Sequence, residues 1–382
     1  MTRLILIFIL LSSAAQVAQA SSPAQQNADW TVMVFMNAKN NLECAGLANF
    51  SQIANVGSSE RVNVVVELGR PVKHRYTNDE GGWTGVLRFR VTQGMHPVES
   101  SAINPADATI RNADMGSGAT LSDFVRWGEE AYPAKKYMLV IWNHGQGWRL
   151  YQSLAAEDRA QLLPVAYRTE AFLPDDGPQP CNGPSGQTLT GGFRSVSFDE
   201  DTGSFLYNRD VGNNLQGLHI AVLGFDACLM AMIESAYAFR GIANTMVASE
   251  ELVPGDGWNY DRWLRDLESN PDMDGVKLAL DIVKSYKETY GDGADTTLSA
   301  IDLTKVNNVT QALAKVSLLV KAKMPIEGPI LAFTRLSFRT FGDWYADSWQ
   351  DCQGSKVMRF QSIDLGQFLA LYEKETKNLE IK

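Results

Sequence analysis

The chain has 382 residues, enough for two or three average domains of roughly 150 residues each. Its composition, 45% hydrophobic and 20% charged, is that of a globular protein and excludes wholesale disorder, collagen and low-complexity scaffolds. Acidic residues outnumber basic ones by 44 to 34, which argues against a nucleic acid or an anionic membrane as the main partner. Four cysteines are too few for a disulfide scaffold, and no closely spaced pair indicates a zinc site.

The first twenty residues have the pattern of a secretory signal. Arg3 precedes an apolar run at residues 4–11, and small residues then lead to Ala18 and Ala20. The run is about half as long as the ~20 residues that a membrane span needs. We therefore predict a signal peptide at 1–20 cleaved after Ala20, a linker at 21–29, and a secreted or periplasmic protein without a stable membrane anchor.

The remaining residues, 30–382, read as one elaborated domain in which apolar β-branched runs alternate with helical patterns. This alternation is typical of parallel strands joined by crossover helices. Fully apolar strands need cover on both faces, so the sequence predicts a three-layer α/β/α sandwich with a mostly parallel central sheet. The predicted strands are at 31–36, 62–68, 137–142 and 219–225, with a hairpin at the sheet edge at 83–91.

One helix start and one helix stop can be read directly. Thr120 and Asp123 resemble a capping box, and Pro133 should stop the helix that follows.

Two segments depart from the alternating pattern. Residues 150–193 form an insertion that is rich in proline and glycine and has no sustained period, which predicts a long surface loop open to proteolysis. From about residue 270 the chain turns helix-rich, with helices expected at 276–290 and 306–323 and a further strand compatible with 299–303. The pattern leaves open whether this C-terminal helical part is a separate domain or a cap on the same sheet.

Two predicted strands end directly before a reactive residue. His144 follows the strand at 137–142, and Cys228 follows the apolar run at 220–225. Ligands bind at the carboxyl edge of a parallel sheet, so neighbouring strands would bring both residues into one crevice. We also place Cys228 at the start of a helix, where free N–H groups and the helix dipole favour a thiolate.

Gly145 can bring its N–H close to a developing oxyanion, and the Cys228 N–H is the natural second donor of such an oxyanion hole. A cysteine nucleophile, a histidine acid/base and two backbone donors describe acyl transfer. An inert buried thiol and a structural histidine are the alternatives for each residue taken alone.

The segments around these residues resemble a known family. The strings Trp-Asn-His-Gly-Gln-Gly-Trp at 142–148 and Asp-Ala-Cys-Leu-Met at 226–230 are similar to those of the clostripain family of cysteine peptidases, which belongs to the caspase-like clan. The likeness extends to residues 30–43, 132–148, 249–260 and 363–365, so it covers most of the chain beyond the signal. It implies a caspase-like fold.

The resemblance also implies an endopeptidase that cleaves after Arg or Lys, with Cys228 attacking the carbonyl and His144 protonating the leaving amine. A buried guanidinium needs an acidic partner. Asp226 and Asp256 correspond to the acidic residues that line this pocket in family members; a helix N-cap and a turn residue, respectively, are the alternatives.

Members of the family are made as zymogens and cut themselves between the His and Cys segments. Arg194 precedes a segment, 195–199, that resembles the strand after the family's processing site, so it is the first candidate. Arg159 and Arg168 are the other candidates.

No cofactor is required by this scheme, although calcium activates the family, and no metal ligands are assigned. The acid-rich segment 199–201 has no calcium-loop pattern and is expected to be solvated. If Cys228 stays reduced, at most one disulfide can form among Cys44, Cys181 and Cys352. We expect a monomer that acts on protein or peptide substrates.

Two alternatives remain at this point. One keeps the fold but changes the pocket, giving Asp, Asn or mixed specificity. The other is a catalytically silent, surface-binding protein on the same scaffold.

Overall fold

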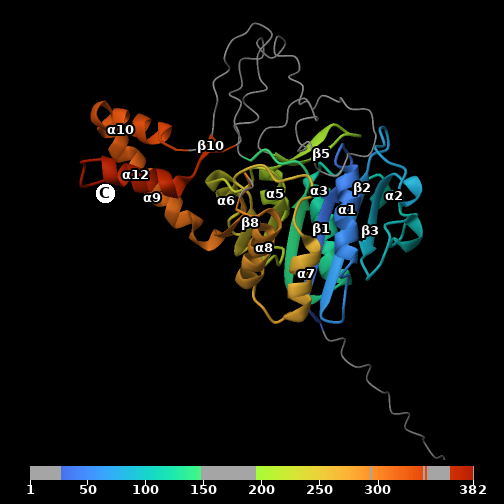
Figure 1. Ribbon diagram of the computed structural model, residues 1–382. Coiled ribbons are helices and arrows are strands. Elements are labelled where there is room, and N and C mark those ends of the chain that lie inside the picture. Colours follow the sequence, from blue (N-terminus) through green and yellow to red (C-terminus); the bar gives the residue numbers. More distant parts are fainter. Residues whose placement is uncertain (1–26, 148–194, 293–294, 339, 342–361, 382) are drawn as a thin grey trace, which may run out of the picture.

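The computed structural model describes residues 27–147, 195–292, 295–338, 340–341 and 362–381 (Figure 1). The predicted signal peptide and the insertion at 150–193 therefore lie outside the described residues, as does most of the predicted linker.

A seven-stranded sheet forms the centre of the described chain, in the order β3-β2-β1-β4-β7-β8-β9. The strands from β2 to β8 are parallel, and β3 and β9 pair antiparallel at the two edges. The strands span Ala28–Asn37 (β1), Val62–Arg70 (β2), Gly85–Arg90 (β3), Ala134–Trp142 (β4), Val222–Asp226 (β7), Thr245–Ala248 (β8) and Ser299–Asp302 (β9).

Each strand predicted from the sequence is present, although β4 begins three residues earlier than predicted and β7 three residues later. Two further differences concern β1 and β3. β1 begins at Ala28, inside the predicted linker, because Ala28 already pairs with Ala134 of β4. The segment predicted as a hairpin at 83–91 is the single edge strand β3, which pairs with β2.

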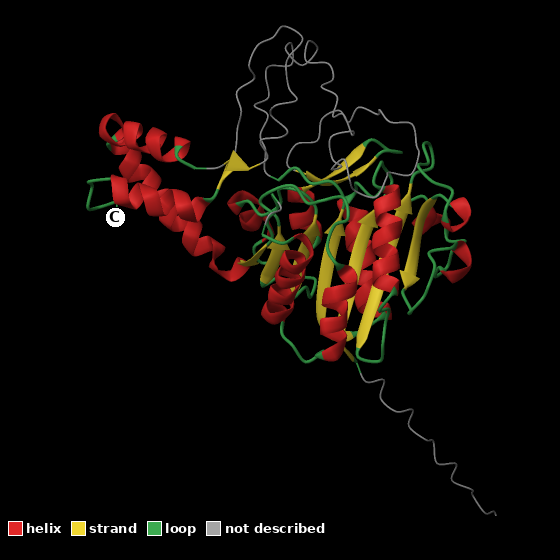
Figure 2. Cartoon of the chain, viewed as in Figure 1, coloured by secondary structure: helices red, strands yellow, loops and turns green. Residues whose placement is uncertain are grey.

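Helices cover both faces of the sheet, as Figures 1 and 2 show. Side chains of β1 alternate between the layers: Trp30 and Val32 face one core, Met33 and Phe35 the other. The first layer holds α1 (Glu43–Ala54), α7 (Tyr260–Ser269) and α8 (Gly275–Tyr290). The second holds α3 (Gly118–Ala131), α5 (Asn208–Asn214) and α6 (Ile233–Phe239). The predicted three-layer fold is confirmed.

The predicted cap of α3 is wrong by three residues. Ser117 is the N-cap, and its side chain accepts a hydrogen bond from the Ala119 N–H. Asp123 does not reach back to the helix start, because its carboxylate pairs with Arg88 of β3 at 2.7 Å. A tertiary ion pair thus replaces the local capping box.

The C-terminal elaboration begins at α9 rather than near residue 270, because α8 and β9 belong to the sandwich. It comprises α9 (Val306–Ala322), α10 (Met324–Leu336) and α12 (Leu365–Glu375), with β10 (Thr340–Phe341) paired to β11 (Ser362–Ile363). The buried Glu327 accepts hydrogen bonds from Tyr372 and Thr376 and so ties α10 to the end of α12.

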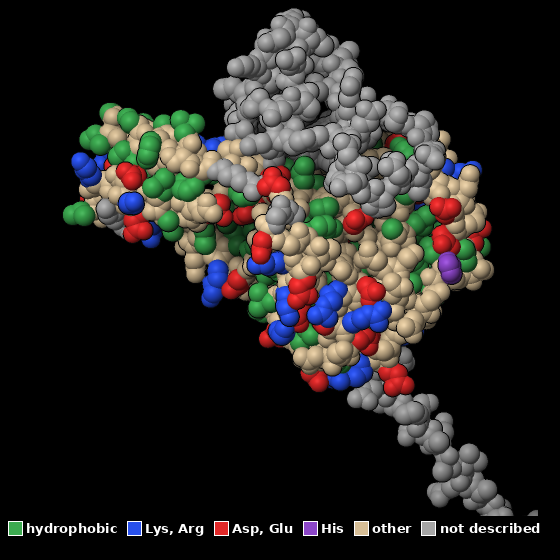
Figure 3. All heavy atoms as spheres, in the orientation of Figure 1, with side chains coloured by type: hydrophobic (Ala, Val, Ile, Leu, Met, Phe, Trp, Pro, Cys, Tyr) green, Lys and Arg blue, Asp and Glu red, His purple; other side chains and the backbone are tan. Residues whose placement is uncertain are grey.

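The surfaces of the two parts differ (Figure 3). Charged side chains of both signs alternate along α7 and α8, where Arg262 pairs with Asp266 and Glu288. The C-terminal helices instead expose apolar side chains, among them Leu318, Phe333 and Leu336. Within the described ranges, no helix has the length and apolar character needed to cross a membrane.

Candidate active site

The loops after β4 and β7 are in direct contact. The two strands are parallel neighbours whose last pair is Trp142 with Asp226, and His144 and Cys228 each come two residues later. A Cβ on Gly145 would lie 2.3 Å from the Cys228 carbonyl oxygen and 3.0 Å from the Cys228 nitrogen. Only glycine fits between these loops. The structure therefore brings the three predicted residues to one place on the carboxyl edge.

The topological switch point of the sheet lies next to this contact, between β1 and β4. From β1 the chain goes to β2 on one side and later returns to β4 on the other side. Connections leave the carboxyl edge in opposite directions there, which opens the crevice where ligands of α/β proteins bind. The turn after β1 supplies Asn41, whose Oδ1 lies 2.9 Å from His144 Nε2.

Asn41 was missed in the sequence, although a signal for it was present. It follows the carboxyl end of β1 in the same way that His144 follows β4. Only the order β1-β4 makes the two residues neighbours.

The backbone around His144 is fixed from several sides. The Asn143 side-chain oxygen accepts hydrogen bonds from the His144 N–H at 2.5 Å and the Phe198 N–H at 3.2 Å. The His144 carbonyl accepts one from Ser197 of β5 (Ser195–Asp199) at 2.9 Å. Burial lowers the pKa of His144 to about 4, so the imidazole is neutral near pH 7.

The Cys228 thiol is covered in this structure. It is 5% exposed, packs against Leu252 and Val253, and its Sγ accepts a hydrogen bond from the Val253 N–H at 3.3 Å. Burial raises the pKa of the thiol to about 11, outweighing the Val253 hydrogen bond, which lowers it. No hydrogen bond joins Sγ to the His144 ring in the described part of the chain.

The expected helix start at Cys228 is wrong. α6 begins at Ile233 with Met232 as N-cap, so a turn separates the thiol from the helix dipole. Within that turn Leu229 adopts a φ of 64°, a left-handed conformation that costs energy for a branched residue and recurs at functional sites. The dipole of α6 therefore does not lower the pKa of the thiol in this state.

Two backbone donors flank the thiol. The bridge between Gly145 and Val196 is made by the Gln146 and Ser197 N–H groups, so the Gly145 N–H is not used in it. Among the described residues, no carbonyl accepts a hydrogen bond from the Gly145 or Cys228 N–H. The Cys228 N–H contacts the thiol of its own residue, which lowers the pKa of that thiol, and neither donor is committed to a carbonyl of the described residues.

Asp226 lies at the end of β7 and is not a helix N-cap. Its buried Oδ2 accepts hydrogen bonds from the Trp258 N–H at 3.1 Å and the Tyr260 hydroxyl at 3.0 Å. Burial raises the pKa of Asp226 to about 7, because no cation among the described residues pairs with it.

Asp256 lies in the tight turn at 254–257, which is closed by a hydrogen bond from the Gly257 N–H to the Pro254 carbonyl at 2.8 Å. The residue is exposed, and no hydrogen bond or ion pair engages its carboxylate in the described part of the chain. Asp226 holds the amide two residues further on. The two predicted acids are therefore linked through one loop that follows β8.

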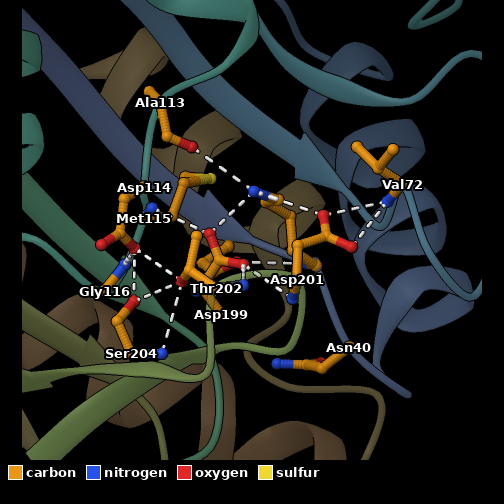
Figure 4. A network of polar contacts seen from close by, with 12 residues as sticks. Asn40, Val72, Ala113, Asp114, Met115, Gly116, Asp199, Asp201, Thr202 and Ser204 are labelled. Atoms are coloured by element: carbon orange, nitrogen blue, oxygen red, sulfur yellow. Dashed lines mark hydrogen bonds and ion pairs between the residues drawn. The ribbon is translucent and has the colours of Figure 1, made fainter.

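The acid-rich segment at 199–201 is not solvated, contrary to expectation (Figure 4). Lys39, from the turn after β1, places its ammonium 2.8 Å from Asp199 Oδ2 and 3.3 Å from Asp201 Oδ2. Backbone N–H groups of Met115 and Val72 also donate to these carboxylates. The Lys39 ammonium thus pairs with two of the three acidic side chains of this segment.

The described residues contain no group of three or more His, Cys, Asp or Glu side chains that could hold a metal ion. Cys228 is a free thiol and Cys44 is disulfide-bonded, while Cys181 and Cys352 lie outside the described residues. The processing candidates Arg159, Arg168 and Arg194 lie outside them too, although Arg194 directly precedes β5.

Fold and site together define an α/β sandwich of the caspase-like type with a cysteine and a histidine on neighbouring strand ends. The model of the clostripain family matches residues 34–161 and 188–376, which is most of the chain. The chain belongs to the clostripain family. Clostripain of Hathewaya histolytica is 26% identical over 268 residues, which are 65% of this chain and 44% of clostripain. The chain thus matches less than half the length of that relative.

Solved structures share the fold. A secreted C11 cysteine protease from Bacteroides thetaiotaomicron, in complex with an irreversible peptide inhibitor, has a TM-score of 0.50 at 17% identity, covering 75% of this chain and 69% of its own. An inactive zymogen of a C11 protease from Parabacteroides distasonis has a TM-score of 0.52 at 15% identity, covering 91% of this chain and 81% of its own.

Proposed function

We propose that this chain is a secreted cysteine endopeptidase that cleaves peptides after Arg or Lys. The observation that carries the proposal is the backbone contact between Gly145 and Cys228, which gathers an imidazole, a thiol and two N–H donors that no described carbonyl engages, next to the switch point of the sheet. Membership of the clostripain family supports the same reaction class.

The chemistry follows from these groups. The Cys228 thiol gives its proton to the neutral His144 imidazole, and the resulting thiolate attacks the scissile carbonyl carbon. The oxyanion that forms accepts hydrogen bonds from the Gly145 and Cys228 N–H groups. His144 in its protonated form gives its proton to the leaving amine as the C–N bond breaks. Water then attacks the thioester, His144 takes a proton from that water, and the acid product leaves with the thiol restored.

Asp226 and Asp256 would select the basic side chain. An arginine or lysine that enters beside Asp226 supplies the cation that this buried carboxylate lacks in the described chain. Asp256 offers a second carboxylate with no partner among the described residues. Because a cation beside Asp226 stabilises its ionised form, the pocket would favour basic substrates over neutral ones of the same size.

The covered thiol supports synthesis as a zymogen. Cys228 is buried under Val253 and has a raised pKa, so this state is not ready to attack. Self-cleavage after Arg194, with Arg159 and Arg168 as the other sites, would create a new terminus next to β5. Because Ser197 of β5 donates to the His144 carbonyl, a change there can reach the site.

The remaining parts of the proposal concern setting and cofactors. We infer export after signal cleavage following Ala20, action as a monomer, and activity without a required cofactor. Calcium remains an activator to be tested; the Lys39 ammonium between Asp199 and Asp201 supports independence from it.

The test is hydrolysis of fluorogenic peptides ending in Arg, Lys, Asn or Asp, with calcium and with a chelator. We expect turnover of the Arg or Lys peptides by the wild type and at least a ~10³-fold loss in Cys228→Ala and His144→Ala. His219→Ala is the matched control, since its exposed side chain lies before β7 at the opposite edge. Full activity in Cys228→Ala would refute the proposal, and mass spectrometry of the incubated chain would locate any cut.

A further inference from the structure

The loop that carries Asp256 is held by an asparagine that the reaction scheme does not use. Asn49 of α1 is 1% exposed and lies between the end of β4 and this loop. Its Nδ2 donates to the Asp256 carbonyl at 2.8 Å, and its Oδ1 accepts a hydrogen bond from Trp142 Nε1 at 2.7 Å.

The orientation of this amide is dictated by its partners. An indole nitrogen can only donate and a backbone carbonyl can only accept. Asn49 must therefore point its oxygen at Trp142 and its nitrogen at Asp256, and the opposite orientation would leave both contacts unfavourable. The buried side chain thus has one hydrogen-bonded arrangement, which fixes the position of the Asp256 backbone relative to β4.

The loop around Asp256 is tightly packed at Gly257. A Cβ on Gly257 would lie 2.9 Å from Asn49 Oδ1 and 2.7 Å from Asp226 Oδ2. The Gly257 carbonyl accepts a hydrogen bond from the Tyr290 hydroxyl at 2.7 Å, and Gly257 itself has a φ of 64°. Asn49 of α1 and Asp226 of β7 therefore both pack against Gly257. The Asp256 side chain is exposed.

We propose that Asn49 is a positioning residue for substrate selection: it holds Asp256 where a substrate guanidinium or ammonium can reach both acids. The inference rests on the proposed cleavage after Arg or Lys. Asn49 touches neither the thiol nor the imidazole, so its effect should fall on the choice and binding of the substrate and leave the bond-breaking step nearly unchanged. Loss of the amide would free the Asp256 carbonyl and leave the Trp142 indole N–H without its acceptor.

The experiment compares Asn49→Leu and the smaller Asn49→Ala with the wild type on two peptides that differ only in the last residue before the scissile bond, Arg or Gln. The readout is the ratio of kcat/KM values for the two peptides on one enzyme sample, so the folded fraction cancels. Asn63→Leu is the matched control: Asn63 is also buried and hydrogen-bonded, to Thr31 and Arg90, but at the start of β2 on the opposite edge.

We expect the Arg-to-Gln ratio to fall about tenfold or more in both Asn49 variants, mainly through a higher KM for the Arg peptide, and to stay within about twofold in Asn63→Leu. An unchanged ratio in the Asn49 variants, or an equal fall in Asn63→Leu, would overturn the inference alone. A wild type without preference for Arg or Lys would instead overturn the proposed function, and the positioning role with it.

Discussion

Replacing Asp226 by asparagine should change how the stability of this chain depends on pH. Asparagine keeps the shape of the side chain and an oxygen that can accept from Trp258 and Tyr260. The wild-type carboxylate is buried and forms no ion pair with a cation of the described residues, and the tyrosines near it stay neutral because burial raises their pKa values. Burial therefore dominates the titration of Asp226.

The sign follows from comparing the folded and unfolded chains. Burial raises the pKa of Asp226 from 3.8 to about 7, so the native state holds the proton more tightly than the unfolded chain does. The stability linked to this proton is fully present below about pH 4 and is lost as the pH rises to about 7. Three pH units at 1.36 kcal/mol each give on the order of 4 kcal/mol lost by the wild type and not by Asp226→Asn.

Urea unfolding at about pH 4.5 and pH 8 measures this difference, with Cys228→Ala as the background to prevent self-cleavage. The stability of Asp226→Asn relative to its parent should rise by several kcal/mol between the two pH values. Asp272→Asn is the control, because the exposed Asp272 carboxylate forms only a surface ion pair with Arg61 and should change by less than about 1 kcal/mol. A relative stability of Asp226→Asn that does not vary with pH would refute the reasoning.

Three further substitutions test contacts around the site. Gly145→Ala should abolish peptide hydrolysis, because the new Cβ would lie 2.3 Å from the carbonyl oxygen of Cys228. Gly366→Ala is the control and should keep full activity, because its Cβ would have no atom closer than 3.4 Å. Lys39→Met should lower the free energy of unfolding by about 3–5 kcal/mol, since it leaves buried carboxylates without their cation, whereas the exposed Lys135→Met should cost under about 1 kcal/mol in the same urea titration. Asn41→Ala should lower kcat about tenfold or more with little change in KM, because the His144 ring loses a hydrogen-bond partner that orients it. An unchanged kcat in steady-state assays would contradict this.

Local sequence patterns predicted the parts of the fold that depend on neighbours along the chain. The apolar runs became β1, β2, β4 and β7, because a strand covered on both faces must be apolar throughout. His144 and Cys228 could be placed at one edge because parallel strands share a carboxyl edge, and this needs only the position of each residue after its strand.

Predictions about local chemistry failed where a distant group competes. Asp123 pairs with Arg88 of β3 instead of capping its own helix. The segment at 199–201 looked solvated but receives the Lys39 ammonium from a turn about 160 residues earlier in the chain. Because a turn follows Cys228, α6 begins only at Ile233. The helix dipole therefore does not lower the pKa of the thiol as expected.

The sequence by itself therefore determined the family, the sheet and the edge where a thiol and an imidazole meet, because these follow from periodicity and from short motifs. Only the tertiary structure decided that the thiol is covered by Val253, that Asn41 reaches His144, and that Asn49 holds the loop of Asp256. Each of these contacts joins residues that the order of strands and the packing of α1 bring together. Their energy depends on burial and on the partner's exact donor or acceptor atom, and neither is encoded in the spacing of residues along one segment.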